Sequence, residues 1–131
     1  MKTRKICITQ HDMERLRALI EVYGGEGADV LEEELDKARI VLPKNIPGDV
    51  ITMNSVVRIK DVATGEERTF ALVFPGNKVE ADTVSILAPA GTALLGYREK
   101  DVVEWQVPAG KKRIQVLEVM YQPERMGKYD V

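Results

Sequence analysis

The chain has 131 residues, enough for one to one and a half small domains, and 44% of them are hydrophobic, enough to bury a core. Charged residues make up 31% of the chain, but 19 basic against 21 acidic residues give a formal net charge of −2. This balance excludes the basic surface on which nucleic-acid binding depends, and no apolar run is long enough to span a bilayer. The single cysteine, Cys7, cannot form a disulfide within the chain and favours a reducing, cytoplasmic setting.

The first predicted element is a helix over residues 10–23. Thr9 can cap its first turn, and Asp12 follows three residues later, where a carboxylate favours the positive end of a helix. Three glycines within residues 24–27 should end this helix, because glycine raises the entropy cost of continuing it. One apolar stripe at three-four-three spacing runs along the helix: Met13, Leu16, Ile20 and Tyr23.

A second helix is predicted over residues 29–42, ending before Pro43, because a proline pushes the preceding residue out of the helical region. Its apolar stripe complements the first: Leu31, Leu35, Ala38 and Leu42. Two such stripes joined by a short glycine loop predict an antiparallel helical hairpin, close to a coiled coil. Each arm of about 14 residues would project roughly 20 Å at 1.5 Å per residue.

Residues 43–48 hold two prolines and a glycine, which predicts a linker between a hairpin at 1–45 and a domain at 50–131. Beyond the linker the hydrophobic period changes to two, with a slip near Leu117 that indicates a bulge. The fold class is therefore α+β, with an antiparallel sheet and one short helix near residues 92–96. Five strands are predicted, around Val57 and Ile59, Phe70 to Phe74, Val84 to Ile86, Val103 to Val107, and Ile114 to Tyr121.

Three motifs in this domain resemble a known family. Residues 88–96 read Ala-Pro-Ala-Gly-Thr-Ala-Leu-Leu-Gly, residues 101–103 read Asp-Val-Val, and residues 108–110 read Pro-Ala-Gly. In this order they resemble the signature of the C-terminal domain of bacterial Gre transcript-cleavage factors. The resemblance implies a C-terminal domain like the FKBP fold, and RNA polymerase as the partner.

Two further segments narrow the resemblance to the Rnk family. Residues 50–57 read Val-Ile-Thr-Met-Asn-Ser-Val-Val, similar to a Val-x-Thr-Met-Asn-Ser segment of that family. The tail from Tyr121 to Glu124, followed by Gly127 and Tyr129, is similar to the Rnk ending. The similarity covers nearly the whole chain and implies a Gre-like protein with a shortened coiled-coil arm.

Acidic residues gather at the tip of the predicted arm, namely Glu26, Asp29 and Glu32. In Gre factors a longer hairpin carries an Asp and a Glu to the polymerase active site, where they help hold a metal ion that activates water. Acidic residues in a first helical turn are also favoured by the helix dipole alone. Because this arm is shorter, its carboxylates should stop well short of the metal. We therefore expect no catalytic residues, no bound metal and no cofactor.

The resemblance also implies a contact with the polymerase rim. In Gre factors the residues just before and at the proline of a Ser-Pro motif make this contact, and the matching positions are Leu87, Ala88 and Pro89. Ala88 replaces the usual serine and Leu87 a polar residue, so a more apolar contact is expected. Leu87 could equally be the buried end of a core strand.

Three functions remain open. The first is a non-catalytic regulator that binds RNA polymerase at the rim of its secondary channel and competes with Gre-type factors without stimulating cleavage. The second is a stand-alone interaction protein with another partner, such as a regulator of nucleoside diphosphate kinase levels. The third is a peptidyl-prolyl isomerase, for which an aromatic content of 5% supplies a poor pocket lining. In each case we expect a monomer without sequence-specific nucleic-acid contacts and without a membrane partner.

Overall fold

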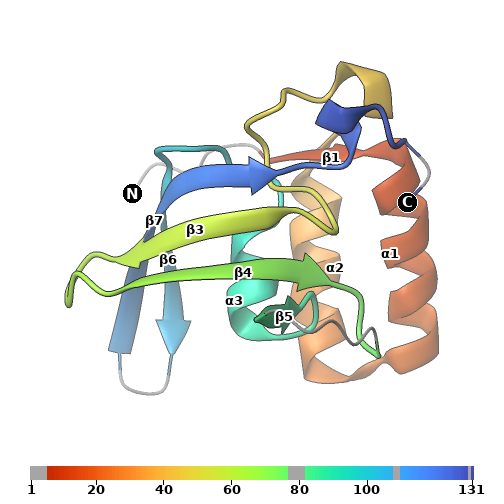
Figure 1. Cartoon of the computed structure of the whole chain (residues 1–131). Coiled ribbons are helices and arrows are strands. Elements are labelled where there is room, and N and C mark those ends of the chain that lie inside the picture. Colours follow the sequence, from red (N-terminus) through yellow and green to blue (C-terminus); the bar gives the residue numbers. More distant parts are fainter. Residues whose placement is uncertain (1–5, 77–81, 108–109, 130) are drawn as a thin grey trace.

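The computed structural model describes residues 6–76, 82–107, 110–129 and 131, and the side chains of all these except 105–107. Two helices stand at one end of a twisted sheet, with a third, short helix beside them (Figure 1). Among the described residues, no helix is long and apolar enough to cross a membrane. Pro108 and Ala109 of the Pro-Ala-Gly motif lie outside the described residues.

Helix α1 (Gln10–Tyr23) has the predicted bounds. The Thr9 side chain accepts a hydrogen bond from the Asp12 backbone N–H at 3.0 Å, so the predicted cap is confirmed. Met13 and Leu16 of the predicted stripe are buried, whereas Tyr23, near the tip, is exposed. Burial is therefore concentrated in the first half of the helix, where it meets the rest of the chain.

Helix α2 (Gly25–Lys37) begins earlier and ends earlier than the sequence predicted. Gly24 and Gly25 both have positive φ, at 60° and 90°, and make the turn. Gly27 is already helical, and a Cβ there would lie 2.9 Å from the carbonyl oxygen of Leu87. The lack of a side chain at Gly27 therefore lets α2 approach the backbone of the sheet domain closely, and this glycine is not part of an open loop.

The end of the second helix was predicted wrongly. Residues Arg39–Val41 form strand β2, which pairs in parallel with strand β1 (Cys7–Thr9). The β-branched residues Ile40 and Val41 suit a strand better than a helix, and this pairing outweighs the apolar spacing that extended the helix to Leu42. Leu42 is 47% exposed instead of completing the stripe. A single 3-10 turn, Pro43–Asn45, follows.

The main sheet has the strand order β5-β4-β3-β7-β6, and it is mixed rather than antiparallel. The five predicted strands are all present, but β4 and β5 pair in parallel. Helix α3 (Pro89–Leu94) lies between β5 and β6 in the chain, near the predicted helical turn. The strands are β3 (Val56–Asp61), β4 (Glu67–Val73), β5 (Thr83–Ser85), β6 (Val102–Val107) and β7 (Gly110–Tyr121).

The predicted bulge in the last strand is confirmed. Along β3 and β7, Arg58 pairs with Glu118 and Ile59 pairs with Val116, so that Leu117 is the extra residue. A second register shift lies between Val56 and Val57. Such bulges increase the local twist of a long strand, and β7 is the longest strand of the sheet.

The helical hairpin packs into the same core as the sheet. One buried cluster joins Leu16 of α1 and Leu31 of α2 to Val57, Leu72 and Val116 of the sheet. The prediction of an arm that projects free of the domain is therefore wrong. The four-three spacing described two faces that bury against each other and against the domain, and spacing alone does not separate those cases. The division into units at 1–45 and 50–131, and the likeness to FKBP, stay predictions.

A buried carboxylate connects α1 to the sheet domain. Asp12 has no exposed surface; one carboxylate oxygen accepts the Met53 backbone N–H at 3.0 Å, and the other accepts Arg15 at 2.6 Å. The Arg15 guanidinium also lies 4.7 Å from the ring centroid of Phe74. A buried carboxylate with a backbone donor and a cation is well satisfied, so it can hold two segments far apart in the sequence together.

The same connection continues to the C-terminal tail. The Thr52 hydroxyl donates to Glu124 at 2.8 Å, and both side chains are buried. Burial raises the pKa of Glu124; the Thr52 hydroxyl partly offsets this, and the nearby Asp12 carboxylate adds to it. The segment around Thr52 therefore contacts α1 on one side and the tail on the other.

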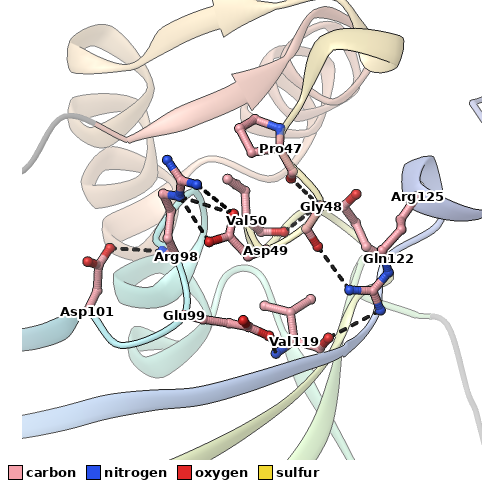
Figure 2. A network of polar contacts seen from close by, with 10 residues as sticks. All are labelled: Pro47, Gly48, Asp49, Val50, Arg98, Glu99, Asp101, Val119, Gln122 and Arg125. Carbon is pink, nitrogen blue, oxygen red and sulfur yellow. Dashed lines mark hydrogen bonds and ion pairs between the residues drawn. The ribbon is translucent and has the colours of Figure 1, made fainter.

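The predicted linker is fixed by a second polar network (Figure 2). The buried Gln122 side chain donates to the carbonyls of Pro47 and Val50, at 2.9 and 2.7 Å, and Arg125 donates to that of Gly48 at 3.1 Å. Arg98 forms an ion pair with Asp49 at 2.9 Å. Backbone carbonyls that have no partner in a strand thus accept hydrogen bonds from side chains of the tail. These hydrogen bonds order the linker.

We predict that Asp12→Asn lowers the free energy of unfolding by about 1–3 kcal/mol, because it weakens the hydrogen bond to Met53 and leaves the Arg15 charge without its partner. Urea denaturation of the full chain measures the loss. Glu14→Gln is the matched control, since Glu14 is an exposed acidic residue of the same helix. An Asp12→Asn variant as stable as the Glu14→Gln variant would contradict the prediction.

A second prediction concerns Glu124→Gln, which keeps an oxygen for the Thr52 hydrogen bond and cannot ionise. The pKa of the Glu124 carboxyl is raised in the folded chain. The contribution of this carboxyl to the free energy of unfolding is therefore complete at a pH below its pKa in the unfolded chain, and it is lost as the pH rises through its pKa in the folded chain. The stability of the variant relative to the parent should therefore increase between about pH 5 and about pH 8. Urea titrations at the two pH values measure it, and a difference independent of pH would refute it.

Candidate functional site

The predicted contact segment lies where β5 leaves the sheet and α3 begins. Leu87 and Ala88 are half-buried, and Pro89 is exposed at the first position of α3. Proline suits this position, because its missing N–H would have no helical partner and its φ is already helical. Of the three predicted contact residues, which are consecutive in the chain, only the proline is exposed.

This segment is held in place by side-chain and backbone hydrogen bonds. The Thr92 hydroxyl donates to the Ile86 carbonyl at 2.5 Å, and the Leu87 N–H donates to the Ser85 hydroxyl at 3.1 Å. The Ala88 N–H donates to the Ser85 carbonyl at 3.0 Å. The segment is therefore preformed, which lowers the entropy cost of binding a partner there. Leu87 is half-buried and packs against the core cluster, as expected for the end of a core strand, and its contact with a partner stays a prediction.

Pro89 lines two grooves. The first has a volume of about 630 Å³ and lies over β3 and β7. Its apolar lining comes from Ile59, Ile114, Pro89 and Ala90, and among the described lining residues there is no aromatic side chain. The charged lining residues carry both signs: Asp61, Glu66, Glu67, Arg68 and Lys112.

The charges around this first groove are largely paired. Lys112 lies 3.4 Å from Asp61, and Arg68 lies 2.8 Å from Asp82. Partial desolvation acts to raise the pKa of Asp61, but the backbone N–H groups of Thr64 and Ala63 and the charge of Lys112 outweigh it and lower the pKa. Asp61 is therefore ionised at neutral pH. The apolar lining residues of the groove are bordered by charged side chains, and ion pairs largely neutralise these charges.

The second groove has a volume of about 490 Å³ and lies between α2 and the α3–β6 region. Its walls come from Gly27 and Val30 on one side and from Leu87, Ala93 and Tyr97 on the other. Three acidic residues line it as well: Glu26, Glu34 and Glu104.

The predicted acidic tip is divided by the structure. Glu26 lines the second groove, whereas Asp29 and Glu32 are exposed and do not. In the part of the chain that the structure describes, no three His, Cys, Asp or Glu residues are placed to hold a metal. Nothing in the arrangement of Glu26, Asp29 and Glu32 supports a metal site, and their expected lack of a catalytic role stays a prediction.

The second groove was not foreseen from the sequence. On α2, the lining residues recur every four positions and lie on one face of the helix: Glu26, Val30 and Glu34. That spacing was visible, but the predicted start at residue 29 placed Glu26 outside the helix. Tyr97 and Glu104 carry no sequence signal, because only the fold brings them opposite α2.

Two family models match the chain. Residues 46–121 match the model described as "Transcription elongation factor, GreA/GreB, C-term", and residues 4–41 match that of the "Rnk N-terminus". The Regulator of nucleoside diphosphate kinase of Escherichia coli (strain K12) is 41% identical to this chain, and the alignment covers 98% of this chain and 98% of that relative.

More distant relatives share only part of their length with this chain. Transcription elongation factor GreA of Clostridioides difficile (strain 630) is 38% identical over 68% of this chain and 57% of the relative. Transcription inhibitor protein Gfh1 of Thermus aquaticus is 36% identical over 70% and 59%. A solved structure, the prokaryotic transcription elongation factor GreA/GreB from Nitrosomonas europaea, is 42% identical with a TM-score of 0.73, covering 91% of this chain and all of that one.

Proposed function

This chain belongs to the Rnk family and is a Gre-factor-like regulator, and from that premise we propose that it binds RNA polymerase at the rim of the secondary channel. There it would compete with Gre-type elongation factors without stimulating transcript cleavage. It would have no catalytic activity of its own. The relatives named as transcription elongation and inhibitor proteins make the polymerase the leading partner.

The preformed segment from Leu87 to Pro89 carries this proposal. It lies within residues 46–121, the part that matches the GreA/GreB C-terminal model. Pro89 is exposed and borders the groove over the sheet, so a partner can bury the proline without disturbing the core. Ala88 has no side-chain cap hydrogen bond to α3. The contact would therefore depend on buried apolar area more than on hydrogen bonds.

The position of the arm supports regulation without cleavage. Helices α1 and α2 have 14 and 13 residues, about 20 Å each. Gly27, near the arm tip, lies against Leu87, one of the proposed contact residues. A molecule docked through Leu87 and Pro89 would therefore keep its arm tip beside the rim. Carboxylates held there cannot reach a metal deep in the channel, which they would have to approach to about 2 Å.

An unrelated partner is the second candidate, favoured by the name of the Escherichia coli relative, Regulator of nucleoside diphosphate kinase. A pull-down from purified components separates the two candidates. The immobilised chain should retain core RNA polymerase and should not retain purified nucleoside diphosphate kinase. Retention of the kinase alone would favour the second candidate and remove the first.

We predict that Pro89→Asp weakens binding of core RNA polymerase at least about tenfold, because an unpaired carboxylate would be desolvated at the centre of the contact. Biolayer interferometry with the immobilised full chain measures the affinity, and circular dichroism verifies the fold. Met126→Asp is the control, since Met126 is an exposed apolar residue of the C-terminal 3-10 turn. If both variants bind like the parent, the docking surface lies elsewhere.

We also predict that the chain does not shorten the transcript of a backtracked polymerase complex, at any magnesium concentration, because its arm tip stays at the rim. Gel analysis of labelled RNA measures this, with a Gre factor as the positive control. Cleavage that Asp29→Ala abolishes would show that the arm does reach the active site.

A further inference from the structure

The groove between α2 and the α3–β6 region has a charge pattern that the proposed function does not use. On α2, Glu26, Val30 and Glu34 line it at a spacing of four, so that an apolar side chain lies between two carboxylates. Opposite them the groove is lined by the half-buried Ala93 and by Val103, a core residue that is only 4% exposed. The face is therefore acidic, then apolar, then acidic along the helix axis.

Its carboxylates are poorly neutralised. Among the described lining residues there is no Lys or Arg, and neither Glu26 nor Glu34 forms an ion pair with any described residue. The ion pairs of Glu104 with described residues are long, at 4.0 Å to Lys111 and 3.8 Å to Arg113. Burial raises the pKa of the Tyr97 phenol, and the negative charge of Glu34 raises it further.

We propose that this groove binds a short extended segment of a protein partner in which one apolar side chain lies between two basic ones. Glu26 and Glu34 are eight residues apart on α2, about 12 Å along the axis. In an extended segment, side chains four residues apart lie on the same face and about 13 Å apart. A pattern of basic, any, apolar, any, basic thus places two cations at the two carboxylates and an apolar side chain over Val30.

The apolar lining makes a protein segment a better occupant than a small polycation. Val30 is 46% exposed, and Leu87, Ala93 and Val103 also line the groove. A polyamine would satisfy the carboxylates but cover this surface poorly, whereas a Leu or Ile side chain would bury it. The carboxylates would then provide orientation and a salt-dependent association rate.

This inference deepens the proposed function and rests on it only for the identity of the partner, which would be RNA polymerase. Pro89 borders both grooves, so one partner could cover the sheet-side groove and the α2 groove together. The α2 groove would then select partners by charge, and the sheet-side groove, with its paired rim, would contribute apolar contact area.

A defined peptide tests the groove without the polymerase. The probe is a blocked peptide with the core Arg-Ser-Leu-Ser-Arg, titrated into the ¹⁵N-labelled full chain at low salt. We expect shifts of the backbone amides of Glu26, Val30, Glu34, Ala93 and Val103. A peptide with Ser in place of the Leu, and spermidine, should each bind at least about fivefold more weakly. Spermidine binding equal to that of the peptide would overturn the proposal, as would shifts confined to other surfaces.

Matched variants test the two carboxylates. The Glu26→Gln/Glu34→Gln double variant should bind the peptide at least about fivefold more weakly than the parent, because both charge pairs are lost. The Glu32→Gln/Glu33→Gln double variant removes two exposed charges from the same helix outside the groove and should bind like the parent. Thermal unfolding of each variant verifies the fold. Equal weakening in both double variants would show a non-specific charge effect and overturn the proposal.

Retention of core polymerase, measured in parallel, distinguishes the two ways of failing. If the peptide fails to bind while the parent chain retains polymerase, the groove proposal is wrong and the proposed function stands. If the peptide binds in the groove while polymerase is not retained, the groove stands and the proposed function is wrong.

Discussion

The buried carboxylate of Asp12 is the contact on which the arrangement of this molecule depends. It joins the first turn of α1 to the backbone of Met53, and the neighbouring Thr52 joins the same segment to Glu124 in the tail. Buried polar groups of this kind tolerate few alternative arrangements, since each lost partner leaves a desolvated charge. The hairpin is thereby oriented on the domain, and the buried cluster that it shares with the sheet adds apolar contacts.

That orientation decides what the arm can do. With Gly27 against Leu87, the tip of the hairpin lies beside the proposed contact segment instead of pointing away from it. Two acidic residues of α2, Glu26 and Glu34, then line a groove that Pro89 also lines. Under the proposed function, an arm in this position would contact the rim of the polymerase channel and would not reach the interior.

Much of the fold could be predicted from the sequence, because local signals dominate there. The Thr9 cap, the strands with alternating Val and Ile, and the bulge at Leu117 follow from neighbours in the chain. The parallel pairing of β1 with β2 could not be predicted, since it depends on a partner 32 residues away. The candidate site shows the same limit of sequence-based prediction. A motif in the sequence predicted the segment from Leu87 to Pro89. Tyr97 and Glu104 could not be predicted, because only the tertiary fold places them near α2.

Native-state hydrogen exchange of the free chain tests most directly whether the arm is an integral part of the domain. If it is, the slowest amides of α1 and α2 exchange with the same free energy of opening as those of β3 and β7, because all of them open only in global unfolding. If the slowest hairpin amides exchange about a hundredfold faster than those of the sheet, the hairpin opens on its own. The arm would then be free to swing away from Leu87, and a fixed position for its acidic tip would be ruled out.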